Sequence, residues 1–169
     1  MRWLALFIAL FGSATQSISA QHNSDVSTTT CTFEDGKQLG VRYTPESSKP
    51  ESSKKEEMHT NELWPSSSSP MYLFTPTDLT IAGSAIPEGA YSMYVIPEKE
   101  KWTLIVDKNV SPGSLYDRKQ DLLRTPMQLG QLSEPQRNID VAFSHIAPRQ
   151  CNLRIYYGKT GAWVEFKEK

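Results

Sequence analysis

The stretch TDLTIAGSAIPEGAYSMYVIPEKEKWTLIVDK, residues 77–108, decides the fold class. Its apolar residues recur at every second position, a pattern typical of strands with one buried face. Each run ends in a segment with Gly or Pro, which supply the backbone angles that turns require. The stretch therefore predicts a three-stranded antiparallel meander. The alternating residues are Leu79 and Ile81, then Tyr91, Met93 and Val95, then Trp102, Leu104 and Val106.

The rest of the chain repeats this pattern of short alternating runs separated by turns. We expect a hairpin at residues 31–43 around Asp35-Gly36, and a last hairpin turning at Gly158-Lys159-Thr160-Gly161. Pro126 favours a sheet edge for residues 122–132. About eight or nine short strands predict an all-β fold: an antiparallel β-sandwich, either immunoglobulin-like or a flattened barrel. The other runs are residues 71–75, 138–146, 151–157 and 162–167.

Tyr91 follows a corner formed by Pro87, Glu88 and Gly89. In immunoglobulin-like domains a corner tyrosine donates its hydroxyl to upstream backbone. An ordinary core tyrosine is the alternative interpretation.

The chain of 169 residues is long enough for one domain with a substantial core. Residues 1–20 are typical of a secretory signal, with Arg2 before a short apolar run and Ile18-Ser19-Ala20 as a cleavage tripeptide. We expect a flexible segment at 21–30 and a single β domain at 31–169. Residues 44–70, rich in Ser, Lys, Glu and Pro, are expected to be a disordered insertion with Leu63 and Trp64 as an anchoring point.

Charge and hydropathy narrow the class of partner. The formal net charge is −1, so electrostatics gives no argument for nucleic acid or an anionic membrane. No apolar run after the signal is long enough to span a bilayer. The sequence predicts an exported protein, periplasmic or secreted, without a transmembrane segment in its mature chain.

Two cysteines, Cys31 and Cys151, remain after removal of the signal. In an exported protein an even number favours a disulfide. Each cysteine also lies at the start of an expected strand, so neighbouring strands could bring the two together. Two separate buried thiols are the alternative.

Motifs for catalysis and metal binding are nearly absent. Ser52-Ser53-Lys54-Lys55 and Lys159-Thr160-Gly161 fit two of the three signatures of penicillin-recognising serine enzymes. The Ser lies in a low-complexity tract, however, whereas the mechanism needs it in a structured site beside its base. His145 is interpreted as a strand-end residue. No catalytic, cofactor-binding or metal-binding residue is assigned, and no cofactor is expected.

Aromatic residues give the remaining functional signal. Exported β-sandwiches often present flat aromatic surfaces to sugars, and the candidates for such a platform are Trp64, Trp102, Tyr157 and Trp163. Tyr156 and Tyr157 are adjacent, so only one of them can face the core. Core packing is the alternative interpretation of all these residues.

Several segments taken together resemble the bacterial exported family known as domain of unknown function 2911. They include CTFEDGK from Cys31, the TDLTIAG and IPEGAYSMYVIP segments, KWTLIVDK, YDRKQDLLRTPM and CNLRIYYGKTGAWVEF, in this order over nearly all of residues 31–166. The resemblance implies export and a β fold rather than an activity. Family members usually carry a run of the type Y-G-K-V-W-R-x-G-A-N-E, and here residues 59–70 depart from it. Trp64 matches the family Trp, but Pro65 replaces the Arg.

These observations favour a non-catalytic, envelope-associated binding or structural β-sandwich, with a glycan or an envelope protein as its partner. The alternative is a secreted enzyme that acts on carbohydrate or cell-envelope material through paired carboxylates. Its candidate acids are Asp107, Asp117 and Asp140. Two carboxylates close together in a cleft would favour the enzyme.

Overall fold

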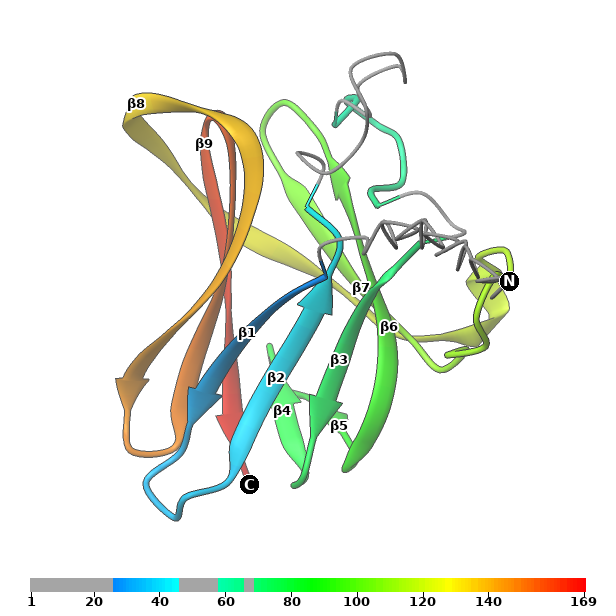
Figure 1. The fold of residues 1–169 in the computed structure, drawn as a ribbon, viewed down its shortest axis with the longest axis vertical. Helices are drawn as coiled ribbons and strands as arrows, with labels where there is room; N and C mark the ends of the chain where they lie inside the picture. The colour runs from blue at the N-terminus through cyan, green and yellow to red at the C-terminus, as the bar shows by residue number, and fades with distance from the viewer. Residues whose placement is uncertain (1–25, 46–57, 66–68) are drawn as a thin grey trace, which may run out of the picture.

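The computed structural model describes residues 26–45, 58–65 and 69–169. Within these residues nine strands form one antiparallel sheet in the order β1-β2-β3-β6-β7-β8-β9-β4-β5 (Figure 1). The strands are β1 (Ser27–Thr32), β2 (Gln38–Tyr43), β3 (Met71–Thr75), β4 (Leu79–Ile81), β5 (Ser84–Ile86), β6 (Gly89–Pro97), β7 (Trp102–Asp107), β8 (Asp121–Ala147) and β9 (Gln150–Glu168). The expected signal at 1–20 lies outside the described residues, as do residues 21–25 of the expected flexible segment.

The sheet folds over on itself through β8, its longest strand. The beginning of β8, up to Met127, pairs with β7, and the remainder from Gln128 pairs with β9. We call strands β1, β2, β3, β6, β7 and the start of β8 the large half-sheet, and the rest of β8 with β9, β4 and β5 the small half-sheet. Because β1 and β5 end the strand order, the sheet is not closed. The all-β prediction is confirmed, as a flattened β-sandwich.

The core lies between the two half-sheets and follows the predicted alternation. Leu104 and Val106 of β7 are fully buried, as are Leu153 and Ile155 of β9. These side chains belong to one continuous cluster of buried residues. Alternation therefore gives each strand one face toward the core and one outer face.

Three local predictions are confirmed. Strands β1 and β2 form the expected hairpin, with Gly36 at a φ of 86° in its turn. The Tyr91 hydroxyl donates to the carbonyl oxygen of Pro87 at 2.9 Å, as expected of a corner tyrosine. The Cys31–Cys151 disulfide is present and joins β1 of the large half-sheet to β9 of the small one.

The expected meander is wrong in its first strand. Strands β6 and β7 pair as predicted, but β4 forms a small hairpin with β5 and pairs on its other side with the end of β9. The place beside β6 is taken by β3. Period-two alternation identifies the buried face of a strand and leaves its partner open, so a partner about 85 residues away in sequence could not be inferred.

The expected hairpin turn at residues 158–161 is also wrong. Strand β9 continues through it, and Gly158, at a φ of 57°, lies opposite Gln136 where the pairing register shifts. The extra residues at this irregularity lie in β8, where five positions separate Gln131 from Gln136, against two between Thr160 and Gly158 on β9. Glycine adopts a positive φ readily, in a strand irregularity as well as in a turn. For the same reason the two runs predicted at 122–132 and 138–146 are parts of one strand, β8. Pro126 does lie at the edge of the large half-sheet, where β8 pairs with β7 alone.

Two described stretches lie within the segments that were expected to be flexible or disordered. Strand β1 begins at Ser27, inside the segment expected to be flexible. Within 58–65, Met58 and Trp64 are buried. Residues 46–57 and 66–68 of the expected insertion lie outside the described residues. In the described part of the chain, no helix has the length and apolar character needed to cross a membrane.

Candidate functional site

Two aromatic side chains of β9 lie on the outer face of the small half-sheet. Tyr156 alternates with Leu153 and Ile155, which point into the core, and Trp163 alternates with buried Ala162 and Val164. The inward positions are odd-numbered before the bulge and even-numbered after it. The bulge at Gly158 therefore brings Tyr156 and Trp163 onto the same face although seven positions separate them.

Two glycines allow these rings to lie against the sheet. A Cβ atom on Gly130 would lie 2.9 Å from Cζ3 of Trp163, and one on Gly161 would lie 3.2 Å from Cδ1 of Tyr156. Gly130 and Gly161 are register partners on β8 and β9. Glycine in a strand often marks a close approach by another group, and here an aromatic ring covers each one.

The rings border a hollow of about 320 Å³ on this outer face. Trp163 is fixed by its Nε1, which donates to Oε1 of Gln128 at 2.9 Å. Arg154 also borders the hollow, and its buried Nε has no hydrogen-bond partner among the described residues. A buried donor without a partner costs about 1–3 kcal/mol. We call this surface the β9 platform; its lining residues are Gly130, Gln131, Leu132, Arg154, Tyr156, Gly161 and Trp163.

Only one of the four aromatic residues proposed from the sequence borders this surface. Trp163 does so, whereas Trp64 and Trp102 are only 4% and 5% exposed and belong to the core. Tyr157 packs against the core. Its neighbour Tyr156 faces outward instead and borders the hollow. The parity of residues 151–155 could have identified it, because Cys151, Leu153 and Ile155 place odd positions inside.

The three candidate acids do not form a single site. Asp140 is an exposed residue of β8, and its Oδ1 accepts from the Tyr43 hydroxyl at 3.5 Å. Asp117 precedes a short 3-10 helix, Arg118–Gln120, and accepts from the backbone N–H of Lys119. Asp107 instead pairs in register with Asp121, an acid that the sequence interpretation missed.

Asp107 and Asp121 are a pair of interacting carboxyls at the junction of β7 and β8. Asp107 is 2% exposed; its Oδ1 accepts from the N–H of Asn109 at 2.7 Å, and its Oδ2 has no partner. Asp121 accepts from the Tyr116 hydroxyl at 2.9 Å and from Nε of Arg124 at 2.5 Å. Burial first, and then the charges of the neighbouring acids, raise the pKa of Asp107 above its ordinary value. Burial and the Asp107 charge also raise the pKa of Tyr94 to about 12.

The raised pKa of Asp107 gives a prediction for stability against pH. Below the ordinary aspartate pKa the acid is neutral in both the folded and the unfolded protein, and it opposes folding only as pH rises through its folded-state pKa. Asp107→Asn keeps an acceptor for Asn109 and gains a donor toward Asp121. We expect this variant to exceed the wild type in free energy of unfolding at pH 7, with a smaller difference at pH 4.

Urea unfolding at the two pH values measures this difference. Glu134→Gln serves as the control, because Glu134 is exposed and lies outside the carboxyl pair. A variant less stable than the wild type at pH 7, by more than at pH 4, would show that the surroundings of Asp107 stabilise its charged form and would contradict the prediction.

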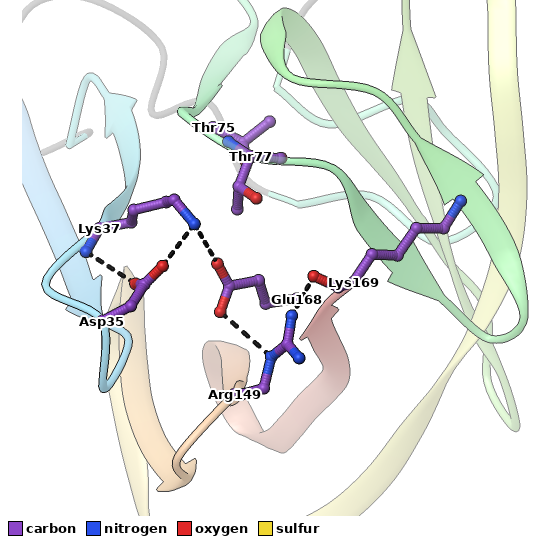
Figure 2. Close-up of polar contacts among 7 residues, drawn as sticks. All are labelled: Asp35, Lys37, Thr75, Thr77, Arg149, Glu168 and Lys169. Atoms are coloured by element: carbon purple, nitrogen blue, oxygen red, sulfur yellow. Dashed lines mark hydrogen bonds and ion pairs between the residues drawn. The ribbon is translucent and has the colours of Figure 1, made fainter.

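A second ionic cluster lies where β9 ends, and it has a structural role. Figure 2 shows Glu168 between Lys37 and Arg149. Its Oε1 accepts from Lys37 Nζ at 2.8 Å, and its Oε2 lies 3.4 Å from Arg149 Nε. Lys37 also forms an ion pair with Asp35, and Arg149 donates to the backbone oxygen of Lys169. The cluster connects the end of β9 to the β1–β2 turn. Two of its members, Lys37 and Arg149, lie close in sequence to the disulfide cysteines.

The remaining motifs form no site among the described residues. Lys159-Thr160-Gly161 is part of β9, and Ser52 to Lys55 lie outside the described residues. His145 lies near the end of β8, opposite Cys151. No group of three or more His, Cys, Asp or Glu side chains suited to a metal ion occurs in the described part of the chain.

The fold and its surfaces define an all-β sandwich with a disulfide, an outer aromatic surface and a buried carboxyl pair. The chain belongs to the family described as "Protein of unknown function (DUF2911)", whose model matches residues 24–166. The resemblance seen in the sequence is thereby confirmed. No curated protein and no solved structure matches the chain significantly.

Proposed function

We propose that this protein is a glycan-binding module and that the β9 platform is its recognition surface. The observation that carries the proposal is the placement of Trp163 and Tyr156, whose rings lie over Gly130 and Gly161 on an outer sheet face. The C–H face of a sugar ring is apolar and suits the negative face of an aromatic ring. Two rings on one flat surface would hold neighbouring sugar units.

The polar groups around the rings favour an acidic sugar. Small-molecule sites combine apolar walls with a few placed polar groups that fix orientation. Gln131 can supply an amide for sugar hydroxyls, and Arg154 supplies a positively charged donor whose Nε has no partner. A guanidinium recognises a carboxylate through charge-assisted hydrogen bonds. A uronic-acid glycan is therefore the preferred ligand class.

The place of action belongs to the same proposal. A signal at residues 1–20 and the Cys31–Cys151 disulfide support export to an oxidising compartment. Extracellular and envelope glycans are encountered there.

The test is calorimetric titration of the oxidised protein with oligogalacturonate, with cellohexaose and chitohexaose as neutral probes. Trp163→Ala is expected to lower the affinity for oligogalacturonate at least tenfold, since a Trp anchor typically contributes about 2 kcal/mol or more. Leu115→Ala removes an exposed side chain, 74% accessible, outside the platform and should bind like the wild type. Equal binding by the Trp163 variant, or heat from none of the three probes, would refute the proposal.

The carboxyl pair supports a second candidate function, hydrolysis of a bound glycan. Asp107 and Asp121 interact at one end of the large half-sheet, and paired acids are the usual machinery of glycosidases. Asp107 is only 2% exposed, so a substrate could reach it only after the residues that bury it had moved. Release of reducing ends during the titration, abolished in Asp107→Asn, would favour the enzyme over the binding module.

A further inference from the structure

A groove of about 490 Å³ lies on the outer face of the large half-sheet, on the other side of the core from the β9 platform. Sites for small molecules usually measure about 300–1,000 Å³, so its size suits a ligand. It crosses β2, β3 and β6 and is bordered by the segment after β7. The lining residues that matter here are Arg42, Tyr72, Phe74, Ala90, Val110 and Pro112.

The walls of this groove are unusually apolar for a surface. Five large hydrophobic side chains are exposed among the described residues, and three of them line the groove. Val26 is 48% exposed, Phe74 41% and Val110 39%. Exposed apolar side chains that gather in one place mark interaction sites, whereas scattered ones need no explanation.

The groove also contains a cation that has no counter-ion in the described part of the chain. Arg42 is exposed on the outer face of β2 and forms no ion pair or side-chain hydrogen bond within the described residues. Its register partner is Tyr72, which lines the same groove. A planar guanidinium beside apolar walls is suited to a carboxylate, which it can hold through two parallel hydrogen bonds.

The sheet register gives the ligand an orientation. Arg42, Tyr72, Ser92, Asp107 and Asp121 are successive register partners across β2, β3, β6, β7 and β8. One end of this row is therefore cationic and the other acidic. An anionic head group is attracted to the Arg42 end and repelled from the acidic end.

The next row of the sheet continues the apolar part of the groove. Phe74 and Ala90 are register partners there, and the small side chain of Ala90 leaves room above the sheet. An apolar body attached to a head group at Arg42 would lie over these two residues.

We propose that this groove binds an aliphatic monocarboxylate of medium chain length, with its carboxylate on Arg42 and its chain over Phe74 and Ala90. The apolar walls exclude a sugar as the preferred occupant, so this site is separate from the glycan platform and does not depend on it. Charge complementarity at Arg42 selects an acid over the corresponding alcohol or ammonium compound.

The experiment is titration of the full oxidised chain with decanoate below its micelle concentration, followed by calorimetry. Decanol and decyltrimethylammonium are the comparison probes. We expect saturable 1:1 binding of decanoate, weakened about tenfold or more in Arg42→Gln because a charge-assisted hydrogen bond is lost. Arg118→Gln, which removes an exposed arginine outside the groove, is the matched control.

Two further variants show whether decanoate binds in this groove rather than at the platform, and whether a loss of binding is caused by unfolding. Ala90→Leu fills the groove and should block decanoate while the thermal transition is preserved. Trp163→Ala should bind decanoate like the wild type, whatever its effect on glycans. Equal affinity for decanol, equal binding by Arg42→Gln, or no binding below the micelle concentration would each overturn the proposal.

Discussion

Reduction of the Cys31–Cys151 disulfide is expected to lower the melting temperature by roughly 10–15 °C. The bond closes a loop with a sequence separation of 120 residues. On the chain-entropy account, a loop of this length contributes about 4–5 kcal/mol by restricting the unfolded chain. It also joins the two half-sheets, so its loss frees β1 from the start of β9. Thermal unfolding followed by circular dichroism, with and without reductant, measures the effect.

The double variant Cys31→Ser with Cys151→Ser is the control, because it removes the bond without reductant. It should melt at the temperature of the reduced wild type, and reductant should not lower it further. An unchanged melting temperature in both samples would mean that the bond does not restrict the unfolded chain, and the ion pairs of Glu168 would then be sufficient to hold this end of the sandwich.

Trp64→Ala is expected to destabilise the protein by about 3–5 kcal/mol, the usual cost of removing a large buried aromatic side chain. Trp64 is 4% exposed. Its backbone exchanges two hydrogen bonds with Val95 of β6, at 2.8 and 2.6 Å. The side chain therefore holds residues 58–65 onto the sheet. Urea unfolding monitored by circular dichroism gives the change in free energy.

Trp163→Ala is the matched control for this variant, because it removes the same type of side chain from an outer face. It should cost less stability, since Trp163 is only partly buried whereas Trp64 is 4% exposed, while it removes glycan affinity. A large loss of stability in Trp163→Ala together with a small one in Trp64→Ala would reverse the assignment of core and platform.

The fold class could be predicted because it depends on alternation and turn chemistry, which are local. The core-facing set of β6 and β7 follows from every second residue. Residues on their other face are buried as well, namely Ser92, Tyr94, Ile105 and Asp107. The pairing of β4 with the end of β9 could not be predicted, since alternation does not specify a strand's partner. The sequence did not indicate that β9 is one continuous strand, for a related reason. Gly158 has the positive φ of a turn but occupies a bulge.

The candidate site was predicted only in part. Trp163 was identified by residue type. Its companion Tyr156 could not be identified in this way, because the bulge changes which positions of β9 face outward. Asp107 was named as a candidate acid, whereas Asp121 could not be joined to it without the register of β7 and β8. Arg42 gave no signal in the sequence, because an arginine in an alternating strand looks like any solvated residue. The missed features all arise from contacts between strands.

The sheet order also constrains when the fold can be completed during synthesis. The β4–β5 hairpin belongs to the small half-sheet and pairs only with the last residues of β9. About 80 residues separate the two, so at ordinary translation rates the hairpin waits on the order of 5–15 s for its partner. Until then its apolar residues have no sheet to join. A chain arranged in this way can complete its sheet only after the last residues of β9 have been synthesised.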